Sequence, residues 1–178
     1  AILAEARTAL GDVTGARRAH EARVELLELA ASQAPDAEAA STYNNALADS
    51  YIELGRGEQA VAMLEKSEAA LPGHYDPPAR LARVYFKLGR HIEARAAIDR
   101  TLALAYGPRR LGYLKLKGEI LFAMGDKAAA MAVLHDEVAG YAALPPGQKR
   151  PTGEAAAQKR LADAEAAEAA ARGKPGQK

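Results

Sequence analysis

The chain has 178 residues, of which 49% are hydrophobic, and alanine supplies about half of that hydrophobic fraction. Aromatic residues make up 5%, cysteine and tryptophan are absent, and the formal net charge is +1. These values exclude a disulfide framework, a zinc ribbon and a thiol nucleophile, and they provide no overall field that would favour nucleic acid or a membrane surface. Because alanine, leucine, glutamate, arginine and lysine all favour helices, the composition predicts an all-α fold.

A short phrase recurs four times along the chain: a leucine or methionine, a glycine, four other residues and an alanine. Its glycines are Gly11, Gly55, Gly89 and Gly125, and the steps between them are 44, 34 and 36 residues. An internal period of this length indicates stacked supersecondary units. A glycine directly after a helix is typical of a position with positive φ, so each phrase predicts the turn between two antiparallel helices.

The first two expected helices form a partial repeat over residues 1–40. A short helix covers residues 1–10, and a second covers about residues 16–32, with Thr14 as its N-cap. Pro35 favours the end of this second helix, because the residue before a proline avoids helical dihedrals. The rest of the segment up to residue 40 is expected to be a longer connection.

Three full repeats are expected after this partial one. They cover residues 41–74, 75–110 and 111–147, so the repeat domain as a whole covers residues 1–147. Their helix pairs are expected at 41–54 with 58–71, 77–88 with 92–105, and 111–124 with 127–142.

The C-terminal part is expected to consist of a linker and a capping helix over residues 148–172. The linker is polar and covers residues 148–153, and the helix that follows is rich in alanine and charge. Leu161 is the one large apolar residue in this helix, which predicts a solvating cap that is marginal on its own. Residues 173–178 are expected to form a disordered tail.

The three full units share several residue types at equivalent positions, and in this they resemble tetratricopeptide repeats (TPR). The shared positions are Leu47, Ala48, Tyr51, Gly55, Ala60 and Leu64; Leu81, Ala82, Tyr85, Gly89, Ala94 and Ile98; and Leu114, Gly118, Leu121, Gly125, Ala130 and Leu134. Ser67, Thr101 and Glu137 depart from the family, which usually has a second alanine there. The resemblance covers about residues 1–145 and implies a right-handed α-solenoid of antiparallel helix hairpins.

The stretch 42–48 follows the longer connection and also resembles the longer repeats of the kinesin light chain type. In such repeats an asparagine of the first helix holds the backbone of a bound peptide. The resemblance therefore implies this role for Asn44 or Asn45.

By the same resemblance, the first helix of each pair lines a groove that binds a partner. The expected groove residues are Asn45, Asp49, Ile52, Arg83, Phe86, Lys87, Lys115, Glu119 and Phe122. Phe86 and Phe122 fall at the same repeat position and could form an apolar strip with Ile52, flanked by positive charge. We therefore interpret the chain as a non-catalytic interaction module or scaffold for a protein or peptide partner. The alternative is that the two phenylalanines only seal contacts between neighbouring helices.

Catalytic, metal and nucleic-acid sites are not expected. No histidine has another histidine four residues later, and no nucleophile or phosphate-binding motif occurs. Two basic runs, one from Arg80 to Arg90 and one from Arg109 to Lys117, could contact phosphate, but acidic residues are nearly as numerous as basic ones. No cofactor and no membrane contact are expected, because no apolar run is long enough to span a bilayer.

Two other hypotheses stay open. The chain could be the TPR appendage of a larger bacterial enzyme, such as a thioredoxin-like one, and serve as its docking or oligomerisation domain. It could also associate weakly with itself through a stacking surface at Ile2 and Leu3. The usage of alanine and arginine suggests a bacterial source, with the cytoplasm or the periplasm as the compartment.

Overall fold

The computed structural model describes residues 6–7 and 9–172, and within these ranges the chain is helical, without strands. The chain divides into two compact units, residues 1–97 and 98–178, and the boundary falls inside helix α7. Ile2, Leu3 and the tail at 173–178 lie outside the described residues, so the expectations for them stay predictions.

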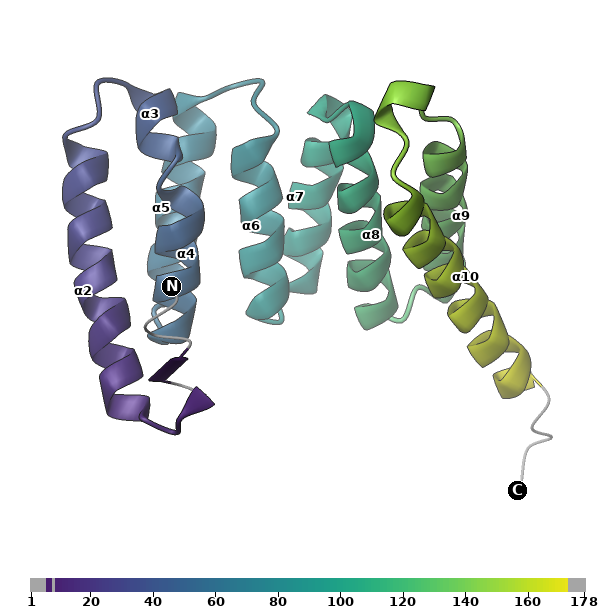
Figure 1. Cartoon of the computed structure of the whole chain (residues 1–178), viewed down its shortest axis with the longest axis horizontal. Helices are drawn as coiled ribbons and strands as arrows, with labels where there is room; N and C mark the ends of the chain where they lie inside the picture. The colour runs from purple at the N-terminus through teal and green to yellow at the C-terminus, as the bar shows by residue number, and fades with distance from the viewer. Residues whose placement is uncertain (1–5, 8, 173–178) are drawn as a thin grey trace. The chain divides into compact units, whose positions relative to one another are not determined.

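Unit 1 is a series of antiparallel helices in which each contacts its neighbours (Figure 1). Helix α2 packs on α4, and α4 packs on both α5 and α6. A short helix, α3, contacts α2 and α5. The helices are α2 (Val13–Ser32), α3 (Ala37–Ser41), α4 (Asn44–Glu53), α5 (Gly57–Ala70), α6 (Asp76–Lys87) and the first half of α7 (His91–Leu104).

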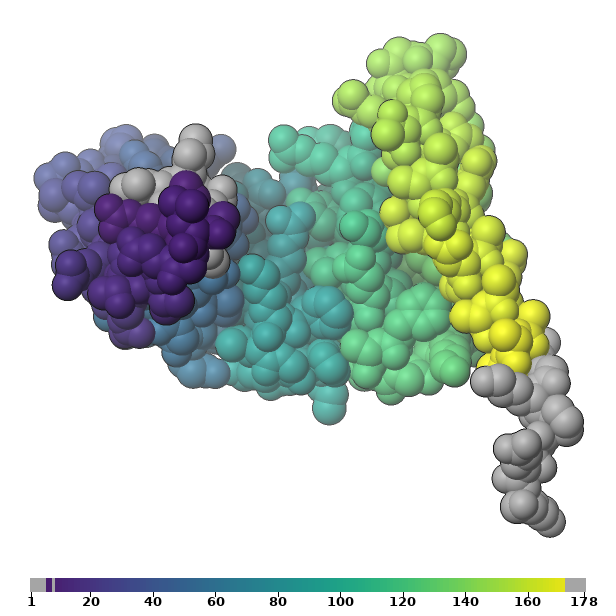
Figure 2. Space-filling model, turned by 60° about the horizontal axis from the view of Figure 1, so that its bottom comes forward, coloured from purple at the N-terminus to yellow at the C-terminus, as the bar shows by residue number. Residues whose placement is uncertain are grey.

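Unit 2 is also built from helices that pack along their neighbours in the sequence. Helix α8 packs along α9, and α9 packs along α10. In Figure 2, α10 is the yellow rod that lies on the green surface of its own unit. Most residues of α10 are exposed. The elements are the second half of α7, α8 (Gly107–Ala123), α9 (Lys127–Ala142), the 3-10 turn η1 (Pro146–Gln148) and α10 (Pro151–Arg172).

The four glycines of the repeated phrase have the predicted geometry. Gly11, Gly55, Gly89 and Gly125 have φ values of 75°, 72°, 73° and 81°. At each turn the N–H of the residue after the glycine donates to the carbonyl five residues earlier, as from Arg56 to Tyr51 at 2.7 Å. This is the Schellman arrangement, which satisfies carbonyls that the end of a helix leaves without partners. The prediction of four helix turns is therefore confirmed.

The alanines of the phrase allow close packing within the hairpins. Ala60, Ala94 and Ala130 have no exposed surface. The large residues of the resemblance, such as Leu64, Leu81 and Ile98, are also fully buried. Burial of these side chains is the main stabilising term, since each side chain of this size contributes about 1.5–3 kcal/mol.

Several helix ends differ from the prediction, and proline or aspartate explains most of the differences. Helix α2 begins at Val13, because Asp12 and not Thr14 is its N-cap and accepts a hydrogen bond from the N–H of Gly15 at 2.8 Å. Asp36 caps the unexpected helix α3 in the same way. Pro108 and Pro151 lie in the first turns of α8 and α10, where a missing N–H costs nothing, so both helices begin earlier than expected.

A tyrosine connects neighbouring helices twice in unit 1. Tyr51 on α4 donates its hydroxyl hydrogen to Glu28 on α2, and Tyr85 on α6 donates to Glu65 on α5 at 2.8 Å. Burial, reinforced by the hydrogen bond to the carboxylate, raises the pKa of each tyrosine from 10 to about 12. Both hydroxyls therefore keep their protons, and their hydrogen bonds, throughout the neutral range.

These pKa values predict a loss of stability at alkaline pH. A group whose pKa is raised by folding binds its proton more tightly in the folded state, so its stabilising contribution is complete below pH 10 and declines between pH 10 and 12. The double variant Tyr51→Phe, Tyr85→Phe lacks this proton linkage. In urea titrations from pH 8 to 12, we expect its stability to fall less steeply than that of the unmodified chain. Equal slopes for the two proteins would contradict the assignment.

Candidate functional site

Most of the predicted groove residues of unit 1 line one hollow between α4 and α6, which we call the α4–α6 hollow. Five of them line it: Asn45, Asp49, Ile52, Arg83 and Lys87. Its volume is about 210 Å³, and Ala48, Arg80 and Val84 complete its wall. The helical spacing of three and four residues puts these side chains on one face of each helix.

The charges in the α4–α6 hollow are only partly paired. Asp49 accepts a hydrogen bond from the side chain of Asn45 at 3.3 Å and forms a long ion pair with Lys87 at 3.9 Å. Arg80 donates to the carbonyl of Ser41, so its guanidinium has a structural partner. Arg83, by contrast, is exposed and has no carboxylate partner among the residues that the structure describes.

Phe86 behaves differently from the other predicted groove residues of unit 1. It is half-buried and does not line the α4–α6 hollow. Its ring lies against His91, with the ring centroids 5.6 Å apart and the planes tilted by 47°. The ring therefore contacts the start of α7, and the expected strip with Ile52 is not formed within this hollow.

The remaining predicted residues lie on α8 in unit 2. Lys115 and Glu119 form an ion pair along one face of the helix at 3.6 Å. Phe122 lies one turn further on and is 38% exposed, which is unusual for a phenylalanine. Phe122 and Phe86 belong to different units, so their common apolar strip stays a prediction.

Asn44 does not have the position that the resemblance to kinesin light chain repeats implied. Its side chain is only 6% exposed, and its NH₂ group donates to the hydroxyl of Ser67 on α5 at 2.8 Å. The Asn44 side chain therefore points from a different face of α4 than the Asn45 side chain. There it borders a second hollow, between α2 and α5, that the sequence analysis did not identify.

Most of the first basic run is used inside the fold. Arg90 forms ion pairs with Glu58 at 3.0 Å and Glu93 at 2.9 Å, and its guanidinium lies 4.6 Å from the centroid of the Tyr85 ring. The pKa of Glu93 is lowered, chiefly by a backbone hydrogen bond and then by Arg90. Because Arg80 and Arg90 already have such partners, the run is a poor match for a continuous phosphate-binding stripe.

The described residues contain no group of three or more histidine, cysteine, aspartate or glutamate side chains that could hold a metal ion. None of the helices in the described ranges combines the length and apolar character that a bilayer-spanning segment needs.

Comparison with protein families identifies the repeat. Residues 51–117 match a family model described as tetratricopeptide repeat. This stretch of the chain has the sequence pattern of tetratricopeptide repeats. The matched stretch runs from Tyr51 on α4 to Lys117 on α8, and it therefore includes all residues of α5, α6 and α7. TPR hairpins stack into solenoids whose extended surfaces bind other proteins, and this architecture is that of an interaction scaffold.

Solved structures show the same TPR-like fold. Two crystal structures of nearly identical TPR-like repeats, from a Podosopora anserina protein named as a kinesin light chain, match this chain with TM-scores of 0.67 and 0.66. In both cases the identity is 23%, and the match covers 94% of this chain and 84% of the other. The α-solenoid of helix hairpins is thus confirmed as the fold class.

No curated protein matches the sequence. Both of the TPR-like repeat structures come from a fungus, so they give no support to the bacterial source that the composition suggested.

Proposed function

We propose that this TPR chain is a non-catalytic scaffold that binds a peptide segment of a partner protein along the first helices of its repeats. The α4–α6 hollow is the part of this surface with the clearest chemistry. The observation that carries the proposal is Arg83, an exposed guanidinium without a carboxylate partner, beside a concave surface lined by Ile52 and Val84.

The chemistry of the hollow favours an acidic residue next to an apolar one in the bound peptide. A guanidinium binds a carboxylate through two parallel hydrogen bonds, and such charge-assisted bonds are roughly twice as strong as neutral ones. Ile52 offers an apolar contact on the opposite helix. The ion pair between Lys87 and Asp49 is long and exposed, so Lys87 can reorient towards a second acidic group at little cost.

The helix α8 of unit 2 offers a second set of contacts in this proposal. Phe122 is a large exposed ring, and aromatic residues are over-represented among the side chains that dominate binding energy. Lys115 and Glu119, two turns and one turn before it, would define the polar edge of that contact. In this proposal Arg83 and Phe122 are separate contact points, one in each unit.

Selection of peptides by display on the purified chain tests the proposal. We expect the selected peptides to contain an aspartate or glutamate next to an apolar residue. Replacing Arg83 with glutamate should weaken their binding about tenfold or more in fluorescence anisotropy, equivalent to about 1.4 kcal/mol. Arg95→Glu is the matched control, because Arg95 is an exposed arginine on α7 that does not line the hollow. Equal affinities for the two variants would refute the proposed site.

A further inference from the structure

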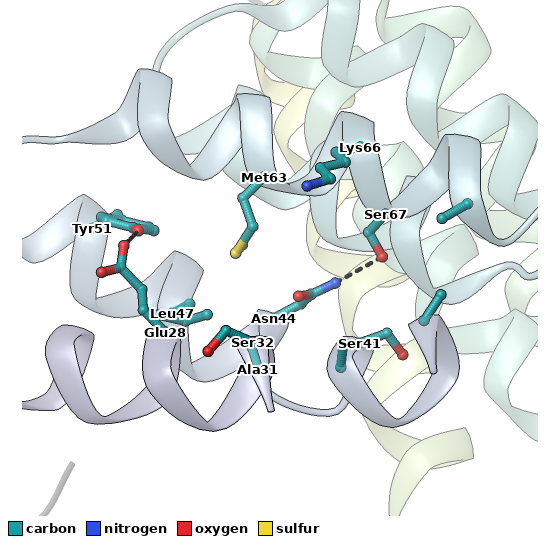
Figure 3. A pocket seen from close by; sticks show the side chains of 13 residues that line it. Glu28, Ala31, Ser32, Ser41, Asn44, Leu47, Tyr51, Met63, Lys66 and Ser67 are labelled. Carbon is teal, nitrogen blue, oxygen red and sulfur yellow. Dashed lines mark hydrogen bonds between the residues drawn. The ribbon is translucent and has the colours of Figure 1, made fainter. Parts of the chain in front are cut away.

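The second hollow of unit 1 lies between α2, α3, α4 and α5, and we call it the α2–α5 hollow (Figure 3). Its volume is about 460 Å³, which lies in the range of ligand-binding pockets. Its apolar walls come mainly from small side chains. They are Ala31, Ala37, Ala40, Leu47, Met63 and Ala70.

Three of the four side-chain hydroxyl groups that line the α2–α5 hollow, all except Ser67, donate their hydrogens elsewhere. Ser32 donates to the carbonyl of Leu29 at 2.7 Å, and Ser41 donates to the carbonyl of Glu38 at 2.8 Å. Tyr51 donates to the carboxylate of Glu28. A hydroxyl that donates elsewhere still has lone pairs, so Ser32, Ser41 and Tyr51 can act only as acceptors toward a ligand in the hollow.

Asn44 adds a buried group to the floor of this hollow. Its NH₂ group is bound to Ser67, and its carbonyl oxygen has no hydrogen-bond donor among the described residues. In Figure 3 this oxygen points away from Ser67, towards the space below Met63. The Asn44 side chain is only 6% exposed, and its oxygen can accept a hydrogen bond from a donor that enters the hollow.

The two ends of the hollow carry opposite charges. Figure 3 shows the pair of Tyr51 and Glu28 at one end and Lys66 with Ser67 at the other. Glu28 and Lys66 are both exposed, and they do not form an ion pair with each other. A cation that enters the hollow is therefore attracted to the Glu28 end and repelled from the Lys66 end.

We propose that the α2–α5 hollow binds the side chain of a lysine or arginine from a partner peptide. The aliphatic stem lies against the alanines and Met63, and the charged head donates hydrogen bonds to Glu28. Asn44 accepts from the backbone or from the head of the same residue. This surface is formed by other residues than the α4–α6 hollow, so it is a second docking point on unit 1.

Lysine and arginine suit this site because they combine a long apolar stem with a head that only donates hydrogen bonds. At the Glu28 end of the hollow, a carboxylate ligand would face a like charge. A purely apolar side chain would leave the oxygen of Asn44 without a donor. The charge and hydrogen-bond pattern thus selects a cationic side chain over both.

The test uses N-acetyl-lysine methylamide as the probe, with N-acetyl-norleucine methylamide as the uncharged control of similar stem length. Two-dimensional NMR follows the side-chain amide signals of Asn44 and the methyl signal of Met63 during titration. We expect both signals to shift with the lysine probe, and at least about fivefold weaker binding of the norleucine probe, which corresponds to about 1 kcal/mol. Equal binding of the two probes, or shifts located elsewhere, would overturn the proposal.

Three variants assign the charges. Glu28→Gln keeps an acceptor for the Tyr51 hydroxyl and should weaken the binding of the lysine probe about fivefold. Lys66→Met removes the repulsion of the cationic head and should strengthen the binding of the lysine probe about twofold to fivefold. Glu25→Gln is the control, since Glu25 is an exposed residue of α2 outside the lining of the hollow. If Glu25→Gln matches Glu28→Gln, or if Lys66→Met weakens binding, the assignment fails.

Hexylammonium, tested in parallel, should bind more weakly than the lysine probe, because it lacks the backbone groups that reach Asn44. Equal binding of hexylammonium and the lysine probe would instead assign the site to free amines.

Discussion

Replacing Arg160 with methionine is expected to destabilise the chain by about 3–5 kcal/mol. Arg160 on α10 forms an ion pair with Glu137 on α9, and the side chain of Glu137 is only 1% exposed. Without the guanidinium, the carboxylate would remain buried without a counter-charge. The desolvation of the Glu137 carboxylate would then either destabilise the folded chain directly or cause α10 to detach from α9.

The environment of this ion pair makes it especially sensitive. The second carboxylate oxygen of Glu137 and the Nε of Arg160 are buried and have no hydrogen-bond partner among the described residues. The remaining hydrogen bonds of the pair therefore offset its desolvation only in part. Replacing both residues with methionine should accordingly restore most of the stability, because a buried ion pair is often no better than an apolar pair of similar volume.

Lys159→Met is the matched control for Arg160→Met. Lys159 is on the same helix, but its ion pair with Asp163 is exposed, and such pairs contribute about 1 kcal/mol or less. Urea denaturation followed by circular dichroism measures the stability, and hydrogen exchange in α10 shows whether this helix detaches. The account is wrong if Arg160→Met is as mild as Lys159→Met, or if the double methionine variant is as unstable as the single one.

The second large effect is expected at Leu81, where alanine should cost about 2.7–5 kcal/mol of unfolding free energy. Leu81 lies on α6 and has no exposed surface, so its removal leaves a cavity that the surrounding helices can only partly fill. Leu26→Ala offers the same chemical change on α2 at a side chain that is 68% exposed. We expect that control to change stability by no more than about 0.5 kcal/mol. Similar values for both variants in thermal and urea unfolding would show that the packing around Leu81 is not as described.

The repeat framework could be predicted from the sequence because it depends on local signals. A glycine after an apolar residue marks a helix end, and the alanine of the phrase marks close approach, so Gly55 and Ala60 already indicate a hairpin. These signals recur at nearly constant spacing, which also makes the stacking predictable. Five of the groove residues could be placed on one surface for the same reason, since helical periodicity fixes the face of α4 and of α6.

The features that escaped prediction depend on partners distant in the sequence. Nothing near Glu137 indicates that Arg160 reaches it, and the alanine-rich pattern of α10 predicts only a weak cap. The orientation of Asn44 is decided by Ser67 on the next helix. Two of the three substitutions of the usual second alanine, Ser67 and Glu137, hold polar contacts between helices.

The α2–α5 hollow had one signal in the sequence, the longer first step of 44 residues between glycines. Its extra residues form α3 and the loops around it, and Ala37 and Ala40 of α3 line the hollow. The length of an insertion does not reveal whether it fills or opens a space, so the hollow itself could not be derived.

The central claim, that the first helices of the repeats bind a peptide, is tested most directly by methyl NMR of the chain with a display-selected peptide. The reporters are Ile52, Ala48 and Val84, which line the α4–α6 hollow, and Ala62 and Ala96, which are exposed on α5 and α7. We predict saturable shifts at the first three methyl groups and none at the last two. Shifts confined to Ala62 and Ala96, with Ile52 unchanged at saturation, would contradict the claim.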